Sequence, residues 1–216
     1  MARRFVREQL REGHRVSAFR CGNADLDRWL VESATSAAIR DYSRTYVWVE
    51  ASGGSTAAGS DSTAGRGDLG EVVACFTLSG FAITRGTSPR RMSRSEYRVI
   101  PALLLGKLAL DISLQGRGYG RILLADAVVE AVRASRLAAA RYLVVDAINP
   151  RAAEFYGQFG FVSIVPAGST GAWAGAELGA GAESGAAGLA GDGSDVGATS
   201  PLRMAARMRD LETALS

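Results

Sequence analysis

Three glycines and two arginines stand close together in the middle of the chain, within the segment Gln115-Gly-Arg-Gly-Tyr-Gly-Arg121. The segment follows an apolar run and precedes one rich in Ile, Leu, Val and Ala, which predicts a turn from a strand into a helix. Glycines let the backbone approach a ligand closely, and the free N–H groups of a first helical turn attract anions. Arg117 and Arg121 could add charge-assisted contacts. The segment therefore predicts a pyrophosphate site, although a purely structural glycine turn would look the same.

Two other phosphate-binding motifs do not fit these residues. The dinucleotide fingerprint requires G-x-G-x-x-G, whereas Gly116, Gly118 and Gly120 alternate with single residues. A Walker A loop would end in Gly-Lys-Ser or Gly-Lys-Thr, which is missing here. The spacing argues against both nucleotide motifs.

The glycine segment and a second motif together resemble the GNAT acetyltransferases. Gln115-x-x-Gly118-x-Gly120 is similar to the loop with which that superfamily binds the pyrophosphate of an acyl-CoA. About thirty residues later, the segment from Asn149 to Phe161 reads N-x-x-A-x-x-F-Y-x-x-F-G-F and is similar to another segment of the same superfamily. Both motifs follow a predicted buried strand, in the superfamily's order and spacing.

A narrower resemblance covers most of the chain. Phe19-x-Cys-Gly-x-x-x-Leu-Asp-x-Trp-Leu30, Ile100–Asp111 and Leu143–Ala147 are similar to segments of the GNAT-type toxins of bacterial toxin–antitoxin pairs. The resemblance implies transfer of an acetyl group from acetyl-CoA to the α-amine of aminoacyl-tRNA, which blocks translation. It also implies neutralisation by a ribbon-helix-helix antitoxin, repression of the operon by the complex, and a homodimer.

The same resemblance implies a role for each residue of the site, with no metal. Acetyl-CoA would place its pantetheine arm beside Leu108, Ala109 and Leu110, and Asn149 would bond that arm. Tyr156 would act as the general acid that protonates the departing thiolate, although it could also belong to a buried aromatic face. The pyrophosphate would contact the residues of the glycine segment, which are Gln115, Gly116, Arg117, Gly118, Tyr119, Gly120 and Arg121.

The general base is not evident from the sequence. Asp111, Asp146 and Glu96 are candidates, but each is more simply explained as a strand-end or loop carboxylate. An α-amine titrates near pH 8 and a lysine amine near pH 10.4, so an α-amine needs less help to become neutral. This favours an α-amino acceptor, with a small amine or a protein N-terminus as the alternative enzyme substrate and a CoA-binding module without turnover as the alternative class.

Arginine dominates the basic residues, since Lys107 is the only lysine among 25 cationic side chains. Codon bias in a GC-rich genome is the simpler explanation of this preference. Five arginines nevertheless precede the central strand, at positions 85, 90, 91, 94 and 98. Arg90, Arg91 and Arg94 are our candidates for contacts with tRNA phosphates, which would make binding salt-dependent. An ordinary solvated loop is the alternative.

The elements around these motifs alternate between strand and helix patterns. A strand and a turn are expected over 5–16, and further strands near 45–50, 70–79, 101–111, 142–147, 161–165 and 202–208. Helices are expected to start at Asn23, Arg121 and Asn149, with a short one at the end. Helical spacing places Leu26, Trp29, Leu30 and Ser33 on one face of the first helix. In the third it places Phe155 and Phe159 in the core, with Tyr156 rotated about 100° away.

We therefore predict an α/β (α+β) fold, and the resemblance implies a mixed, mostly antiparallel sheet with splayed central strands flanked by helices. Segments 51–70 and 167–200 consist mainly of Gly, Ala, Ser and Thr and lack apolar periodicity, which predicts flexible inserts within a single domain spanning 1–216. The position of the last strand, which follows the second insert, is uncertain.

Composition excludes several other classes. The chain has 216 residues, of which 47% are hydrophobic, and a formal charge of +3. Its two cysteines, Cys21 and Cys75, lie too far apart in sequence for a zinc ribbon and are too few for a disulfide scaffold. The sequence shows neither a signal peptide nor a run of about 20 strongly apolar residues, so a cytoplasmic protein without membrane contact is expected.

Overall fold

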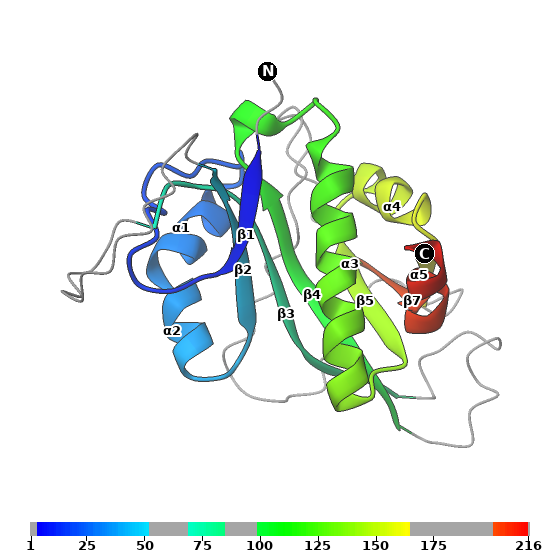
Figure 1. Cartoon of the computed structure of the whole chain (residues 1–216). Helices are drawn as coiled ribbons and strands as arrows, with labels where there is room; N and C mark the ends of the chain where they lie inside the picture. Colours follow the sequence, from blue (N-terminus) through cyan, green and yellow to red (C-terminus); the bar gives the residue numbers. More distant parts are fainter. Residues whose placement is uncertain (1–3, 52–68, 85–98, 165–200, 216) are drawn as a thin grey trace.

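The computed structural model describes residues 4–51, 69–84, 99–164 and 201–215. These residues form a sheet with helices on both faces (Figure 1). The strands are β1 Phe5–Gln9, β2 Arg44–Glu50, β3 Val72–Thr84, β4 Val99–Leu110, β5 Tyr142–Ala147, β6 Val162–Ser163 and β7 Leu202–Arg207. The helices are α1 Ala24–Glu32, α2 Ala34–Ile39, α3 Tyr119–Ala138, α4 Pro150–Gly157 and α5 Met208–Ala214, with a 3₁₀ turn, η2, at Ile112–Leu114.

The sheet has the order β1-β2-β3-β4-β5-β7-β6. Among the described strands, β4 and β5 form the one parallel pair, and all other neighbours are antiparallel. The last strand, β7, lies between β5 and β6, with Tyr142 opposite Arg207. This settles the position that the sequence left uncertain. The predicted fold class, a mixed and mostly antiparallel sheet flanked by helices, is confirmed.

The two central strands separate along their length. Only Ala102–Leu105 of β4 pair with β5, opposite Tyr142–Val145, although β4 continues to Leu110. The separation begins at an irregularity, because the register with β3 shifts after Thr77 opposite Lys107 to Leu78 opposite Leu105. Gly106 is the additional residue in β4, and its Cα faces Thr77 so closely that a Cβ would lie 3.1 Å from Oγ1. A bulge of this kind bends a strand and ends pairing on its far side.

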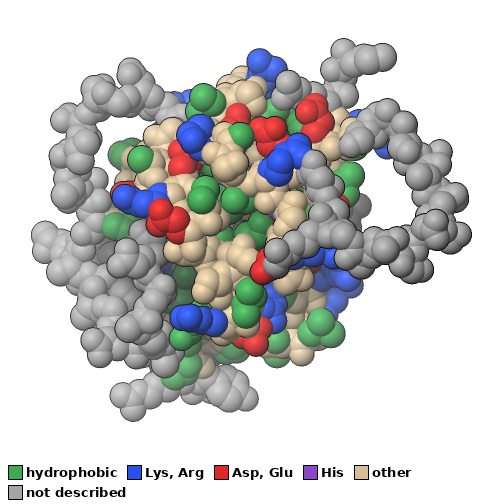
Figure 2. Space-filling model, turned by 90° about the vertical axis from the view of Figure 1, so that its left-hand side faces the viewer, with side chains coloured by type: hydrophobic (Ala, Val, Ile, Leu, Met, Phe, Trp, Pro, Cys, Tyr) green, Lys and Arg blue, Asp and Glu red, His purple; other side chains and the backbone are tan. Residues whose placement is uncertain are grey.

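The helices bury two different apolar surfaces of the sheet. On one face, α3, α4 and α5 pack against side chains such as Leu108, Leu110 and Val145. On the opposite face, α1 and α2 cover Val47, Cys75 and Ala109. On the side that carries α1 and α2, the described residues show charged and apolar side chains interspersed rather than gathered by kind (Figure 2).

The starts predicted for the first and third helices are confirmed, because Asn23 and Asn149 are the N-caps of α1 and α4. The Asn23 side chain accepts hydrogen bonds from the N–H groups of Asp25 and Leu26, both at 3.1 Å. At α4, Asn149 Oδ1 accepts from Ala152 N–H at 2.8 Å, and Pro150 occupies the first helical position. Each cap satisfies N–H groups that have no partner within the helix.

Two details of the helix faces differ from the prediction. Ser33 lies at the break between α1 and α2 and is exposed, and the next residue, Ala34, takes the buried position. In α4, Tyr156 is 1% exposed, whereas Phe155, and Phe159 just after the helix, are only partly buried. The reason is that α4 turns the stripe of Ala152 and Tyr156 toward the sheet, so the two phenylalanines lie at the margin of the core.

Candidate active site

The glycine segment forms an open loop that leads into α3. Gly116 and Gly118 have φ of +70° and +82°, a backbone conformation that residues other than glycine rarely adopt. A Cβ atom added at either position would meet no other atom within 4 Å. Gly118 is the N-cap of α3 and offers no side chain to the first-turn N–H groups. The helix begins at Tyr119, two residues earlier than predicted. The loop is therefore exposed, and its N-cap residue offers no side chain to the first-turn N–H groups, which favours an anion there.

The residues just before the loop are fixed to the segment that precedes α1. The Gln115 side-chain amide donates to the carbonyl groups of Cys21 and Leu110, each at 2.9 Å. Ile112 N–H donates to Arg20 O at 2.8 Å. The Gln115 side chain therefore holds the loop in place in this structure, while its direct contact with a cofactor stays a prediction.

Asp111 has a structural role at the end of β4. Its carboxylate accepts hydrogen bonds from Ser113 N–H at 2.9 Å and from Arg20 N–H at 3.0 Å. Burial by itself would raise the pKa of Asp111, but these backbone hydrogen bonds outweigh it and bring the pKa below its usual value. The simpler of the two interpretations considered for Asp111, a strand-end carboxylate, agrees with this geometry.

The Asp111→Ala variant is expected to lose about 1 kcal/mol of unfolding free energy at pH 7, because it removes a cap. Since the pKa of Asp111 is lower in the folded state, its contribution is complete above about pH 4 and is lost as the pH falls through the folded value. The difference from the wild type should therefore shrink in acid. Urea unfolding across this range measures it, with Asp111→Asn as the uncharged control. A difference independent of pH would contradict the assignment.

The two arginines of the loop differ in their contacts. Arg121 donates from Nη2 to Gln158 Oε1, and its guanidinium lies 5.8 Å from the centre of the Phe159 ring. It thereby connects the first turn of α3 to the end of α4. Arg117 is exposed in the loop itself. Arg117 is the better placed of the two to reach a ligand without breaking a contact made in this structure.

The end of β4 offers backbone groups to the gap between β4 and β5. Asp111 N–H bonds Val73 O of β3, so the backbone groups of Asp111 and Ala109 face β3. Because successive residues of a strand alternate in direction, those of Leu108 and Leu110 face the gap. Leu110 O is already bonded to Gln115, which leaves Leu108 as the better candidate for a ligand lying in the gap.

Tyr156 lies in the same buried cluster as Leu108 and Leu110, on the face covered by α3 and α4. Its ring contacts Phe155 and Phe161, with centroid distances of 5.4 Å and 5.7 Å. Burial, and secondarily the charge of Asp146, raise the pKa of Tyr156 above its usual value. The phenol is therefore protonated at neutral pH, which is the state that a general acid needs.

Asp146, the second candidate base, is paired within the sheet. Arg203 of β7 lies opposite it and donates from Nε and Nη2 to its two oxygens, at 2.6 Å and 2.7 Å. The Arg203 guanidinium also lies 4.8 Å from the centre of the Phe81 ring. A carboxylate held in such a two-point ion pair is poorly placed to accept a proton from a substrate.

The contact that Lys107 makes was not predicted from the sequence. The side chain of this only lysine is almost buried, and its ammonium lies 4.3 Å from the centre of the Trp29 ring of α1. This is a cation–π contact between β4 and α1 beside the bulge. The one sequence signal was an isolated lysine within an apolar strand, which is too weak to identify the contact.

The two cysteines lie in the core between α1 and the sheet and form no disulfide. Burial raises the pKa of Cys21 to about 12 and also raises that of Cys75. Neither thiol is therefore available as a thiolate nucleophile near neutral pH.

Several predicted features lie outside the described residues. These are the arginines at 85, 90, 91, 94 and 98, the carboxyl group of Glu96, and almost all of the two low-complexity segments. Within the described residues, no group of three or more His, Cys, Asp or Glu is placed to hold a metal ion. In the same part of the chain, the helices are too short or too polar to cross a bilayer.

Comparison with known proteins agrees with this geometry. Residues 63–161 match the model of the acetyltransferase (GNAT) family, and this range contains the glycine loop, the gap between β4 and β5, and Tyr156. The chain carries a GNAT acetyltransferase domain. The predicted superfamily and enzyme class, an acetyltransferase, are thereby confirmed.

Similar proteins include a curated sequence and several solved structures. This chain is 29% identical over 146 residues to the tRNA-acetylating toxin of Mycobacterium tuberculosis (strain ATCC 25618 / H37Rv). The matched region covers 68% of this chain and 77% of that protein. A mutant of KacT superposes with a TM-score of 0.69 at 21% identity, covering 97% of this chain and 98% of that one. AtaT complexed with acetyl-methionyl-tRNAfMet gives 0.67 at 21% identity, covering 99% and 100%.

Proposed function

We propose that this acetyltransferase uses acetyl-CoA to acetylate the α-amine of aminoacyl-tRNA and thereby blocks translation. The observation that carries the proposal is the open glycine loop at the N-terminus of α3, next to a gap between two parallel strands and a buried tyrosine. This arrangement would provide an anion site, backbone groups free of strand pairing for an extended arm, and a proton donor. All three are needed to use a CoA thioester.

Acetyl-CoA fits the residues that are present. Its pyrophosphate would lie against the first-turn N–H groups of α3, where Gly116 and Gly118 leave the approach open. The pantetheine arm would follow the gap along β4, bonding the backbone of Leu108 and the amide of Asn149. Asn149 Oδ1 caps α4, so its Nδ2 is the group left to donate to the arm.

The acetyl transfer balances with the groups at hand. The neutral amine nitrogen attacks the thioester carbonyl, so that a C–N bond forms as the C–S bond breaks. Tyr156 gives its proton to the departing sulfur, and the proton released by the amine nitrogen restores the phenol through solvent. A general base is not required if the acceptor is an α-amine, because a substantial part of it is neutral near pH 7.

The choice of aminoacyl-tRNA as the acceptor is supported by the similar proteins. The curated relative is named a tRNA-acetylating toxin, and AtaT has been solved with acetyl-methionyl-tRNAfMet. On this basis Arg90, Arg91 and Arg94 remain our candidates for phosphate contacts. A ribbon-helix-helix antitoxin, a homodimer and a cytoplasmic location belong to the same proposal.

The proposal is tested by incubating the chain with acetyl-CoA and charged tRNA and measuring N-acetylated aminoacyl ends by mass spectrometry. We expect acetylation of charged tRNA and none of the same tRNA after deacylation. Free amino acid and a peptide with a free N-terminus serve as competing acceptors. Equal or faster acetylation of either one would favour the alternative substrate class, a small amine or a protein N-terminus.

A further inference from the structure

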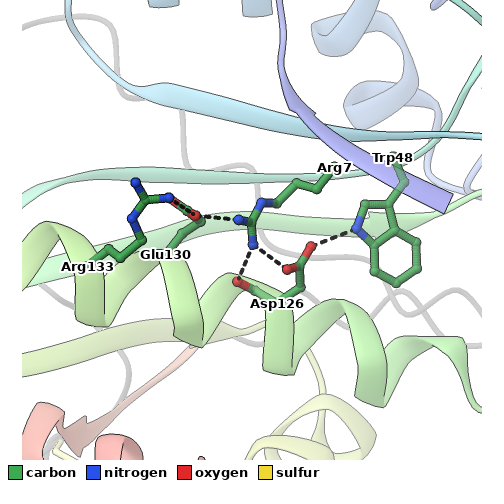
Figure 3. Close-up of polar contacts among 5 residues, drawn as sticks. All are labelled: Arg7, Trp48, Asp126, Glu130 and Arg133. Atoms are coloured by element: carbon green, nitrogen blue, oxygen red, sulfur yellow. Dashed lines mark hydrogen bonds and ion pairs between the residues drawn. The ribbon is translucent and has the colours of Figure 1, made fainter.

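A set of charged side chains joins the edge strand β1 to α3 (Figure 3). Arg7 of β1 forms ion pairs with two carboxylates one turn apart on α3, Asp126 and Glu130, and its Nη2 lies 2.5 Å from Glu130 Oε1. Trp48, opposite Arg7 on β2, donates from Nε1 to the other oxygen of Asp126 at 2.8 Å. Arg133 contacts Glu130 at 3.3 Å. Both carboxylates are therefore held against the β1–β2 pair.

An aromatic contact extends this set to the glycine loop. The Phe5 ring stacks on Trp48, with centroids 5.4 Å apart and an interplanar angle of 7°. The same ring meets Tyr119 edge to face, at 5.4 Å and 83°. Tyr119 is the first residue of α3 and directly follows Gly118. A continuous series of contacts thus runs from the ion pairs to the residue whose N–H group opens the proposed pyrophosphate site. We call these six residues, Phe5, Arg7, Trp48, Tyr119, Asp126 and Glu130, the β1–α3 network.

The burial of the network makes its geometry specific. The Glu130 side chain is only 8% exposed, and those of Arg7 and Asp126 are 24% and 23% exposed. The Arg7 guanidinium binds Asp126 through one nitrogen and Glu130 through another. A lysine has a single nitrogen at its end and cannot hold both carboxylates in this fixed geometry. Satisfied polar groups in a half-buried setting favour one arrangement of the elements that carry them. The network therefore sets how the start of α3 lies against β1.

We propose that β1 is a positioning element for the pyrophosphate loop. Arg7 ties the strand to α3, and Phe5, stacked on Trp48, fixes Tyr119 and with it the first-turn N–H groups of α3. β1 and Trp48 precede residue 63, so they lie outside the region that matches the acetyltransferase family model. The inference rests on the proposed function, because it takes acetyl-CoA to be the ligand of the loop.

The test compares Phe5→Leu with the wild type, using two acetyl donors. We expect calorimetry to show acetyl-CoA binding about three- to tenfold more weakly, which is the range for loss of an edge-to-face ring contact. With charged tRNA as acceptor, KM for acetyl-CoA should rise while kcat stays near the wild-type value. S-acetylpantetheine, which carries the thioester without the nucleotide, should be used equally well by both proteins. An equal loss with both donors, or unchanged acetyl-CoA binding, would overturn the inference.

Two further comparisons separate positioning from stability. Arg7→Met should weaken acetyl-CoA binding, and Arg7→Lys should restore part of it. Ile100→Ala truncates a buried side chain of β4 in a different core cluster, and it should lower the melting temperature without changing the Kd for acetyl-CoA. If Ile100→Ala weakens binding as much as Phe5→Leu does, the effect is general destabilisation and the inference fails. If the wild type itself does not bind acetyl-CoA, the proposed function fails and the inference fails with it.

Discussion

Replacing Tyr156 with phenylalanine is expected to lower kcat for acetyl transfer by about 10²- to 10³-fold, the usual contribution of a general acid. The change removes one hydroxyl and keeps the ring that packs on Phe155 and Phe161. Burial raises the pKa of Tyr156, so the hydroxyl of the wild type is protonated throughout the neutral range. The rate difference between the variant and the wild type should therefore be the same at every pH in this range. Single-turnover acetylation of charged tRNA measures the effect, and calorimetry with acetyl-CoA should show nearly unchanged binding.

A matched control is available on β5. Tyr142 is also buried, at 3% exposed, so Tyr142→Phe removes a hydroxyl from a comparable environment outside the α4 motif. We expect this variant to keep nearly all of its activity. If Tyr156→Phe transfers acetyl groups as fast as the wild type, the phenol is not the acid, and Tyr156 serves only the core.

The parts of the site that depend on local geometry could be predicted from sequence. Gly116 and Gly118 mark a loop because their backbone conformations are available mainly to glycine. Asn149 followed by Pro150 marks the start of α4, because the Asn side chain accepts from a first-turn N–H and Pro at the first helical position has no N–H to satisfy. These signals act within a few residues and need no knowledge of the rest of the fold.

Contacts between distant elements could not be predicted in the same way. Phe5 and Tyr119 meet across more than one hundred residues, and neither residue type signals the other. The rotation of α4, which buries Tyr156 more deeply than Phe155, is set by packing on β5 and β7 rather than by the helix's own pattern of residues. Lys107 against Trp29 depends on the bulge that re-aims β4.

The described carboxylates near the gap between β4 and β5 already make hydrogen bonds within the protein. This affects which amine can serve as the acetyl acceptor. Asp111 binds two backbone N–H groups, and Asp146 binds Arg203 through both oxygens. Using either as a base would break these contacts. An acceptor whose amine is already partly neutral near pH 7 suits such a site better than a lysine side chain, which would need a strong base. The geometry of the carboxylates therefore supports an α-amino acceptor independently of the similar proteins.

Replacing Gly118 with alanine is expected to weaken acetyl-CoA binding about tenfold or more. At φ of +82° an alanine is strained by about 1–2 kcal/mol, although its Cβ meets nothing within 4 Å. The loop can relieve this strain only by rotating its backbone, which moves the N–H groups of the first turn of α3 away from the pyrophosphate. The added methyl group also stands where the ligand approaches. Calorimetry measures the Kd, and transfer to charged tRNA should show a raised KM.

The control for Gly118→Ala is Gly13→Ala, in an exposed turn after β1 with φ of +103°. Both variants introduce the same methyl group at a left-handed position, so both should lose similar unfolding free energy. Only Gly118→Ala should lose affinity for acetyl-CoA, because Gly13 has no place in the proposed site. If the two variants bind acetyl-CoA equally well, the glycine loop is only a turn, and the pyrophosphate must bind elsewhere on the domain.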